Sequence, residues 1–174
     1  MFQNYKSMKQ LIFSFFVLVS ATMLLSCNDN SLEKQRQQEL DFLNAYMDEN
    51  YPDAEPKPSG LYYIEDKAGT GDTIKVGDKV QIFYATYMIT HDSVPIDQSS
   101  GYTEGYRYEP LEFTVGAGSV IAGLDEAMTY MQKGTVATLI IDSGLAYGQN
   151  GSGSVPAFTT LRMEVEVYKV YPAN

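Results

Sequence analysis

The segment TTLRMEVEVYKV, residues 159–170, constrains the fold more than any other part of the chain. Charged residues there alternate with apolar ones, the apolar set being Leu161, Met163, Val165 and Val167. Because successive side chains of a strand point to opposite faces, this pattern predicts a strand with one buried and one solvated face. Strands of that kind are typical of an antiparallel sheet that is covered on one side.

Four further segments carry strand patterns, so the sheet has several members. The segment at 79–90 places Val80, Ile82, Tyr84, Thr86 and Met88 on one face. The other three segments are 61–66, 111–115 and 135–142, and a GTGD turn at 69–72 follows the first of them.

A single amphipathic helix interrupts these strands. Apolar residues recur at helical spacing until Gly134, namely Val120, Ile121, Leu124, Ala127, Met128 and Met131. One helix against the buried face of an antiparallel sheet predicts an α+β domain. We expect this domain to span residues 58–174.

A second helix is expected before the domain. Residues 31–50 contain no glycine or proline, are rich in strong helix formers and begin with Ser31, which is placed to cap the helix. Three prolines in residues 51–60 end the helix and form a linker. The segment 28–57 is therefore interpreted as a helical spacer with a Pro-rich linker, and the alternative is a helix that binds a partner.

The first 27 residues have the pattern of a secretory signal. Lys6 and Lys9 precede an apolar run at 11–25, which is short for a bilayer span, and translation can begin at Met1 or Met8. The run ends in a sequence that resembles the lipobox of bacterial lipoproteins, in which the cysteine is acylated. That residue, Cys27, is the only cysteine, so no disulfide can form within a monomer.

Two interpretations of Cys27 remain at this point: a lipid anchor, or a stray cysteine after an ordinary cleaved signal. We expect the anchor, with the chain exported to the bacterial cell envelope and held on the outer membrane. All 22 acidic residues follow the signal, against ten basic ones, so the exported part has a net charge near −12. Such a surface repels nucleic acids and anionic lipid head groups, so membrane association must come from the lipid.

The glycine-rich loop at 148–154 is not a phosphate-binding loop. It has no lysine and leads through Pro156 into a strand, whereas a phosphate loop leads into a helix N-terminus. The single histidine, His91, cannot build a common zinc site or a serine–histidine triad. Ser152 and Ser154 are interpreted as loop residues. We expect no cofactor and no metal.

The order of motifs from residue 58 to 170 resembles the FKBP-type peptidyl-prolyl cis-trans isomerases. The matching pieces are 59–87, IDQSS at 96–100, 111–148 with LAYG near its end, and 155–170. The resemblance implies a curved, half-open antiparallel sheet around one helix, with an apolar pocket for a prolyl ring between them. The residues it assigns to the pocket are Tyr84, Ile96, Asp97, Leu111, Val120, Ile121, Leu124, Tyr147 and Met163.

The resemblance also implies roles for some of these residues. The Tyr147 hydroxyl and the Ile121 backbone N–H would hold substrate carbonyls, and Asp97 would pair with Arg107. The sequence departs from the family pattern at the pocket floor, where Leu124 replaces a frequent tryptophan. Three walls that are usually phenylalanine are aliphatic here, at Ile96, Leu111 and Met163. The expected pocket is therefore apolar but wider.

Two functions from different classes follow from this resemblance. The first is a lipid-anchored isomerase that acts on proline-containing exported polypeptides. The second is a catalytically weak binding module or chaperone of the same fold, which would hold a partner in the wider pocket or on the segment 98–110. A third, weaker interpretation is that the helix at 31–50 docks the chain to an envelope complex.

Overall fold

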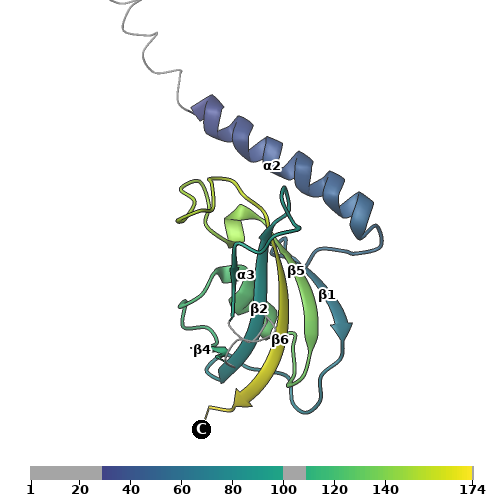
Figure 1. Ribbon diagram of the computed structural model, residues 1–174, viewed down its shortest axis with the longest axis vertical. Coiled ribbons are helices and arrows are strands. Elements are labelled where there is room, and N and C mark those ends of the chain that lie inside the picture. Colours follow the sequence, from purple (N-terminus) through teal and green to yellow (C-terminus); the bar gives the residue numbers. More distant parts are fainter. Residues whose placement is uncertain (1–28, 100–108, 174) are drawn as a thin grey trace, which may run out of the picture. The chain divides into compact units, whose positions relative to one another are not determined.

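A computed structural model describes residues 29–99 and 109–173 of this chain (Figure 1). The predictions for the signal segment 1–27, Cys27 and Arg107 lie outside these residues. None of the described helices is long and apolar enough to cross a membrane.

The domain is an open antiparallel sheet around one short helix, as the sequence predicts (Figure 1). The strands run in the order β1-β5-β6-β2-β3, and β4 also pairs with β2. Their bounds are β1 Tyr62–Lys67, β2 Lys79–Met88, β3 Asp97–Gln98, β4 Leu111–Thr114, β5 Val136–Ile141 and β6 Leu161–Tyr171. All five strands predicted from the sequence are present, as β1, β2, β4, β5 and β6.

The two longest strands, β2 and β6, form the centre of the sheet. They pair from Lys79↔Tyr171 to Met88↔Leu161, with a bulge between Gln81 and Ile82. The alternation predicted for β6 is confirmed, since Leu161, Met163, Val165 and Val167 are buried. In β2, Val80 and Ile82 are buried on the same side as the half-buried Tyr84.

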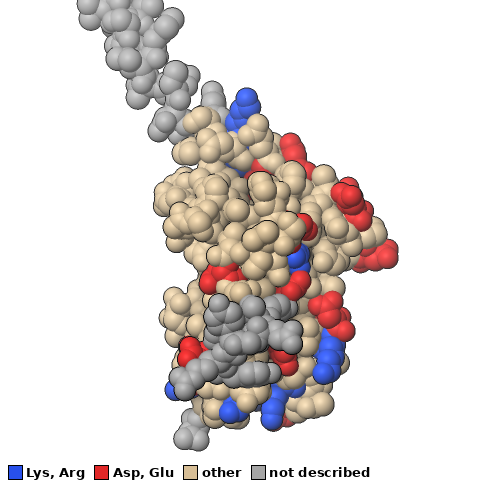
Figure 2. All heavy atoms as spheres, in the orientation of Figure 1, with Lys and Arg blue, Asp and Glu red and all other residues tan. Residues whose placement is uncertain are grey.

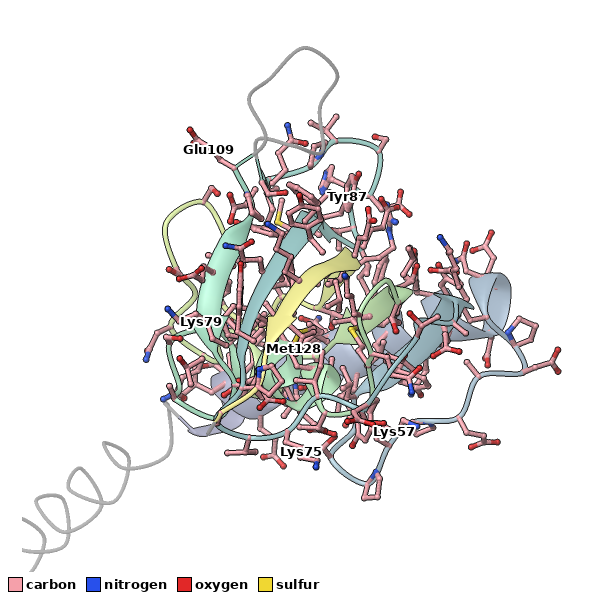
Figure 3. The ribbon with its side chains drawn as sticks, turned by 90° about the horizontal axis from the view of Figure 1, so that it is seen from below. Lys57, Lys75, Lys79, Tyr87, Glu109 and Met128 are labelled. Atoms are coloured by element: carbon pink, nitrogen blue, oxygen red, sulfur yellow. The ribbon has the colours of Figure 1, made fainter. Side chains whose placement is uncertain are left out.

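The helix α3, Ala122–Met128, covers the concave face of the sheet and fills its core. Figure 3 shows Met128 toward the middle of the molecule and Lys75 and Lys79 near its edges. Close approach to β5 requires Gly123, because a Cβ there would lie 2.5 Å from Ile141 Cγ2.

α3 is shorter than the sequence predicts. The expected helical spacing runs from Val120 to Met131, but Thr129 ends the helix. The N–H groups of Thr129, Tyr130 and Met131 bond three residues back, and the Thr129 hydroxyl donates to the Glu126 carbonyl. Threonine can satisfy backbone groups locally and so favours helix ends. Met131 is still fully buried, because the following turn points it into the same core.

The N-terminal helix α2, Asp29–Asn50, agrees with the predicted helix at 31–50. The chain divides into two compact units after Gln38, and the second unit is Glu39–Asn174. This unit includes the last twelve residues of α2. Leu43 and Met47 pack there against Ile89 and Ile140, on the sheet face opposite to α3.

The buried carboxylate of Asp78 fixes the chain beyond β6 to the turn before β2. It accepts hydrogen bonds from the N–H groups of Lys75 (2.8 Å) and Ala173 (2.9 Å). These bonds lower the pKa of Asp78 below its ordinary value of 3.8, and the bond from Lys75 makes the largest contribution. Because the folded pKa is the lower one, the stabilisation is complete above the unfolded pKa and is lost as the pH falls through the folded pKa.

We expect Asp78→Asn to lower the free energy of unfolding at pH 7 by about 1–2 kcal/mol, since the amide keeps the shape but accepts fewer bonds. The difference from the unsubstituted protein should shrink as the pH falls below about 4, because Asp78 is protonated there first in the unfolded chain and only at lower pH in the folded protein. Urea unfolding at pH 7 and pH 3 measures both values. A difference that does not depend on pH would contradict the assignment.

Candidate functional site

A cavity of about 420 Å³ lies between α3 and the concave face of the sheet. All nine described residues that the family resemblance assigns to a pocket line this one cavity, and Arg107, which it also assigns there, lies outside the described residues. From the sheet come Tyr84 of β2, Asp97 of β3, Leu111 of β4 and Met163 of β6, together with Ile96 just before β3. From the other side come Val120 and Ile121 before α3, Leu124 within it, and Tyr147.

The pairing of β3, β4 and β6 with β2 brings the sheet residues together. Thr86 of β2 lies opposite Asp97 of β3 on one side and opposite Met163 of β6 on the other. Tyr84 is two residues from Thr86, so both side chains point to the same face. Leu111 pairs with Ile82 farther along β2. The wall of the cavity is therefore set by backbone pairing.

A hydrogen bond joins Tyr84 and Asp97 across the cavity wall. The Tyr84 hydroxyl donates to Asp97 Oδ2 over 2.9 Å. Burial raises the pKa of Tyr84, and the bond to Asp97 raises it further. The phenol therefore stays protonated at neutral pH and acts as a donor. This contact was not anticipated from the sequence, which suggested only Arg107 as a partner of Asp97.

Backbone bonds hold the segment 96–99 in place beside β2. The Ile96 N–H donates to the Thr86 carbonyl (2.8 Å), and the Ser99 N–H donates to the Tyr84 carbonyl (2.9 Å). The Ser99 hydroxyl accepts a bond from the Tyr84 N–H (3.0 Å). Asp97 is thus fixed between two anchored residues, and its carboxylate is presented to the cavity.

Ile121 occupies the cap position of α3. Its φ of −61° and ψ of 145° are extended, and its carbonyl accepts bonds from the N–H groups of Leu124 and Asp125. The N–H of a cap residue precedes the hydrogen-bonded turns of the helix, so the helix does not use it. Ile121 also lines the cavity, and the family resemblance assigns to its N–H a bond to a substrate carbonyl.

Tyr147 follows a short 3-10 helix, η2, Ser143–Leu145. The Asp142 side chain caps η2 by accepting from the Leu145 N–H, and the Gly148 N–H donates back to the Ser143 carbonyl (2.8 Å). The Tyr147 side chain is 38% exposed. It therefore lies at the mouth of the cavity, with part of the ring accessible to a substrate.

The loop after Tyr147 folds into a tight turn that forms one edge of the cavity. Ser152 and Val155 exchange two backbone hydrogen bonds of 2.9 and 2.8 Å, and the Phe158 N–H donates to the Gly148 carbonyl. The four turn residues 152–155 all line the cavity. The sequence predicted a loop here, but glycine and serine gave no sign that these residues would contact the cavity individually.

Three other lining residues were missed, namely Thr86, Ser119 and Leu161. Thr86 lies on the predicted β2 face with Tyr84, so the period-two pattern could have identified it. Leu161 shares the buried face of β6 with Met163. Ser119 carries no signal except its place before Val120.

The mouth of the cavity bears little charge. Residues 143–161 contain no ionisable acid or base other than Tyr147. Figure 2 shows the corresponding loop surface mostly without Lys, Arg, Asp or Glu. Within residues 29–99 and 109–173, no group of three or more His, Cys, Asp or Glu side chains could hold a metal ion. The lining offers apolar walls, hydroxyls, one carboxylate and backbone N–H groups.

Residues 71–168 match the family model of the FKBP-type peptidyl-prolyl cis-trans isomerases. This match covers more than half of the chain. The chain belongs to the FKBP family. FKBP-type proteins are isomerases that act on proline-containing polypeptides, so the chain is assigned to this class of enzyme.

Two curated FKBP relatives match different shares of this chain. A probable FKBP-type isomerase of Haemophilus influenzae is 35% identical over 145 residues, which is 83% of this chain. The chain spans only 56% of the length of that relative. An FK506-binding protein of Neisseria meningitidis serogroup B is 36% identical over 114 residues, covering 64% of this chain and 98% of the relative.

Two solved FKBP-type structures resemble this one. FkpA from Escherichia coli aligns over all of this chain and 75% of its own, with a TM-score of 0.67 and 26% identity. A peptidyl-prolyl isomerase from Pseudomonas syringae aligns over 81% of this chain and 96% of its own, with a TM-score of 0.66 and 26% identity. The α+β fold expected from the sequence is confirmed.

Proposed function

We propose that this protein catalyses the cis-trans isomerisation of prolyl peptide bonds in polypeptides, with the prolyl ring bound in the cavity between α3 and the sheet. One observation carries the proposal. Tyr84, Asp97, Ile121 and Tyr147 surround a single cavity, and its remaining predicted residues supply apolar walls. The chain would need no cofactor or metal for this reaction, because no covalent bond is broken.

The mechanism that this lining supports is non-covalent. The barrier to rotation about a prolyl amide, about 18–20 kcal/mol, arises from amide resonance, and water stabilises the charge-separated planar form. Leu124 and Met163 are almost completely buried, at 2% and 4% exposed, so a ring placed against them leaves water. Removal of water disfavours the planar amide, and fixed donors at Ile121 and Tyr147 can favour the twisted form.

Activity with a proline-containing peptide tests the proposal. We expect the unsubstituted protein to accelerate isomerisation at micromolar concentration in a protease-free assay. Tyr147→Phe should lower kcat/KM by about tenfold, because it removes a donor that is partly exposed to water and therefore weaker than a buried one. Asp97→Ala should lower kcat/KM by about as much, because the Tyr84 hydroxyl loses its acceptor. Equal rates for all three proteins would separate these residues from the activity.

A protein that does not accelerate isomerisation points instead to the second function, a binding module or chaperone. Refolding of a client without a rate-limiting proline step distinguishes the two. Assistance there, together with no isomerase activity, would favour the binding module. Its proposed segment 98–110 falls mostly on residues that the structure does not describe.

The second part of the proposal concerns location. We infer that the signal segment 1–27 exports the chain to a bacterial envelope, where Cys27 is acylated and holds it on the outer membrane. The residues that follow Cys27 connect this anchor to the compact unit Glu39–Asn174, which contains the isomerase domain. The apolar run, the lone cysteine and the acidic mature sequence support this inference. Labelling with a fatty-acid analogue should mark the protein and should fail with Cys27→Ser. Labelling that persists in Cys27→Ser would contradict the anchor.

A further inference from the structure

The carboxylate of Glu39 in α2 is buried although no step of the proposed mechanism uses it. Glu39 is 7% exposed, and its two principal partners, Ser143 and Thr160, are 2% and 3% exposed. A buried carboxylate is costly unless hydrogen bonds compensate for the lost water. This one accepts three such bonds, so its position is closely defined.

The three bonds go to the two ends of one loop. Glu39 Oε1 accepts from the Ser143 N–H (2.6 Å) and from the Thr160 hydroxyl (2.9 Å), and Oε2 accepts from the Ser143 hydroxyl (2.6 Å). Ser143 begins η2, which leads to Tyr147, and Thr160 directly precedes β6. The segment between these two residues contributes Tyr147 and the turn 152–155 to the lining of the cavity.

The same part of α2 also supports the other side of the cavity. The Tyr46 hydroxyl donates to Asp92 Oδ2 over 3.2 Å, and the Asp92 carbonyl accepts from Arg162 Nη2 over 3.0 Å. Ile89, which begins the turn that contains Asp92, is buried in the cluster of Leu43 and Met47. This turn leads into Ile96 and Asp97.

We propose that Glu39 is a positioning residue of the isomerase, which fixes the loop 144–159 and with it Tyr147 by joining the two ends of that loop. The expected effect of Glu39 on catalysis rests on the proposed isomerase function. Its role in fixing the loop does not depend on that function. The Glu39 carboxylate binds both ends of the loop at once, through Ser143 at one end and Thr160 at the other. Charge-assisted bonds of this kind are about twice as strong as neutral ones.

Hydrogen exchange on the full chain, purified in detergent, tests the structural part. In Glu39→Ala, the amides of residues 144–159 should exchange about tenfold faster or more, because both loop ends lose their acceptor. Amides in the middle of β2 should not change. Asp48→Ala removes an exposed carboxylate of the same helix and should leave all these rates unchanged. Faster exchange everywhere, or nowhere, would overturn the proposal.

Glu39→Gln provides a milder variant that retains the shape of the side chain. Its carbonyl oxygen can still accept from the Ser143 N–H and the Thr160 hydroxyl, so loop exchange should lie between those of the unsubstituted protein and Glu39→Ala. If Glu39→Ala does not fold, the comparison of Glu39→Gln with Asp48→Ala decides the question, and equal loop exchange in those two variants would contradict the proposal.

A double-mutant cycle with Tyr147→Phe tests the catalytic part. At a temperature where circular dichroism shows each variant to be folded, Glu39→Ala should lower kcat/KM about tenfold in the unsubstituted background. It should lower kcat/KM by no more than about threefold in the Tyr147→Phe background, because the effect through Tyr147 is lost there and only the effect through the turn 152–155 remains. Equal losses in both backgrounds would overturn this role. An inactive unsubstituted protein would contradict the proposed function alone, since the exchange result stands apart from activity.

Discussion

Ile121→Pro is expected to lower kcat/KM by on the order of 10²-fold while the domain stays folded. Proline removes the backbone N–H that would hold a substrate carbonyl, and loss of one fixed donor typically costs about 10²–10³ in rate. The φ of Ile121, −61°, is already the value that proline imposes. The helix does not need the lost N–H either, since its first bonds are accepted by the Ile121 carbonyl.

Ile121→Val is the matched control for this substitution. Valine has about the bulk of proline and shortens the cavity wall in a similar way, but it keeps the N–H. We expect its rate to fall by less than about threefold, in proportion to the small loss of apolar contact. Progress curves for a proline peptide give kcat/KM for each protein. Similar losses in the two variants would mean that the Ile121 side chain matters and its N–H does not.

The sequence could predict the sheet and the side-chain walls because both follow from periodicity. Alternation in β6 placed Met163 and Leu161 on one face, and the motif order placed Tyr147 and Asp97 at the cavity. It could not predict contacts made by distant polar residues. Glu39 is one of several acids in a polar helix, and only the folded chain brings it to Ser143 and Thr160, more than 100 residues away.

The two ends of α3 show a second reason why the sequence could not predict the whole structure. An apolar stripe continues from Val120 to Met131, but burial of Met131 does not require helix, and hydrogen bonds at Thr129 end α3 earlier. Periodicity reports which side chains are buried and not which backbone conformation buries them. The glycines of 148–154 likewise suggest a pliable loop by composition, whereas backbone bonds fold them into a defined turn.

Gly151→Ala is the second substitution with a large expected effect, because Gly151 is needed for this turn. Its φ is +66°, and a Cβ there would lie 2.3 Å from the Val155 carbonyl oxygen and 2.8 Å from the Pro156 carbonyl carbon. These are backbone atoms, so the turn itself must shift and its Ser152–Val155 bonds must lengthen. Gly153→Ala is a close control, since its φ is +55° but nothing lies within 4 Å of the added Cβ.

Both substitutions place alanine in the left-handed region, which costs about 1–2 kcal/mol. The clash should cost Gly151→Ala about 1–3 kcal/mol more, as overpacking does elsewhere. Thermal unfolding measures this difference, and KM shows whether the displaced turn also alters the cavity mouth. We expect KM to rise several-fold for Gly151→Ala and to change little for Gly153→Ala. Equal stability and equal KM would mean that the turn adapts freely, and that residues 152–155 do not define the cavity.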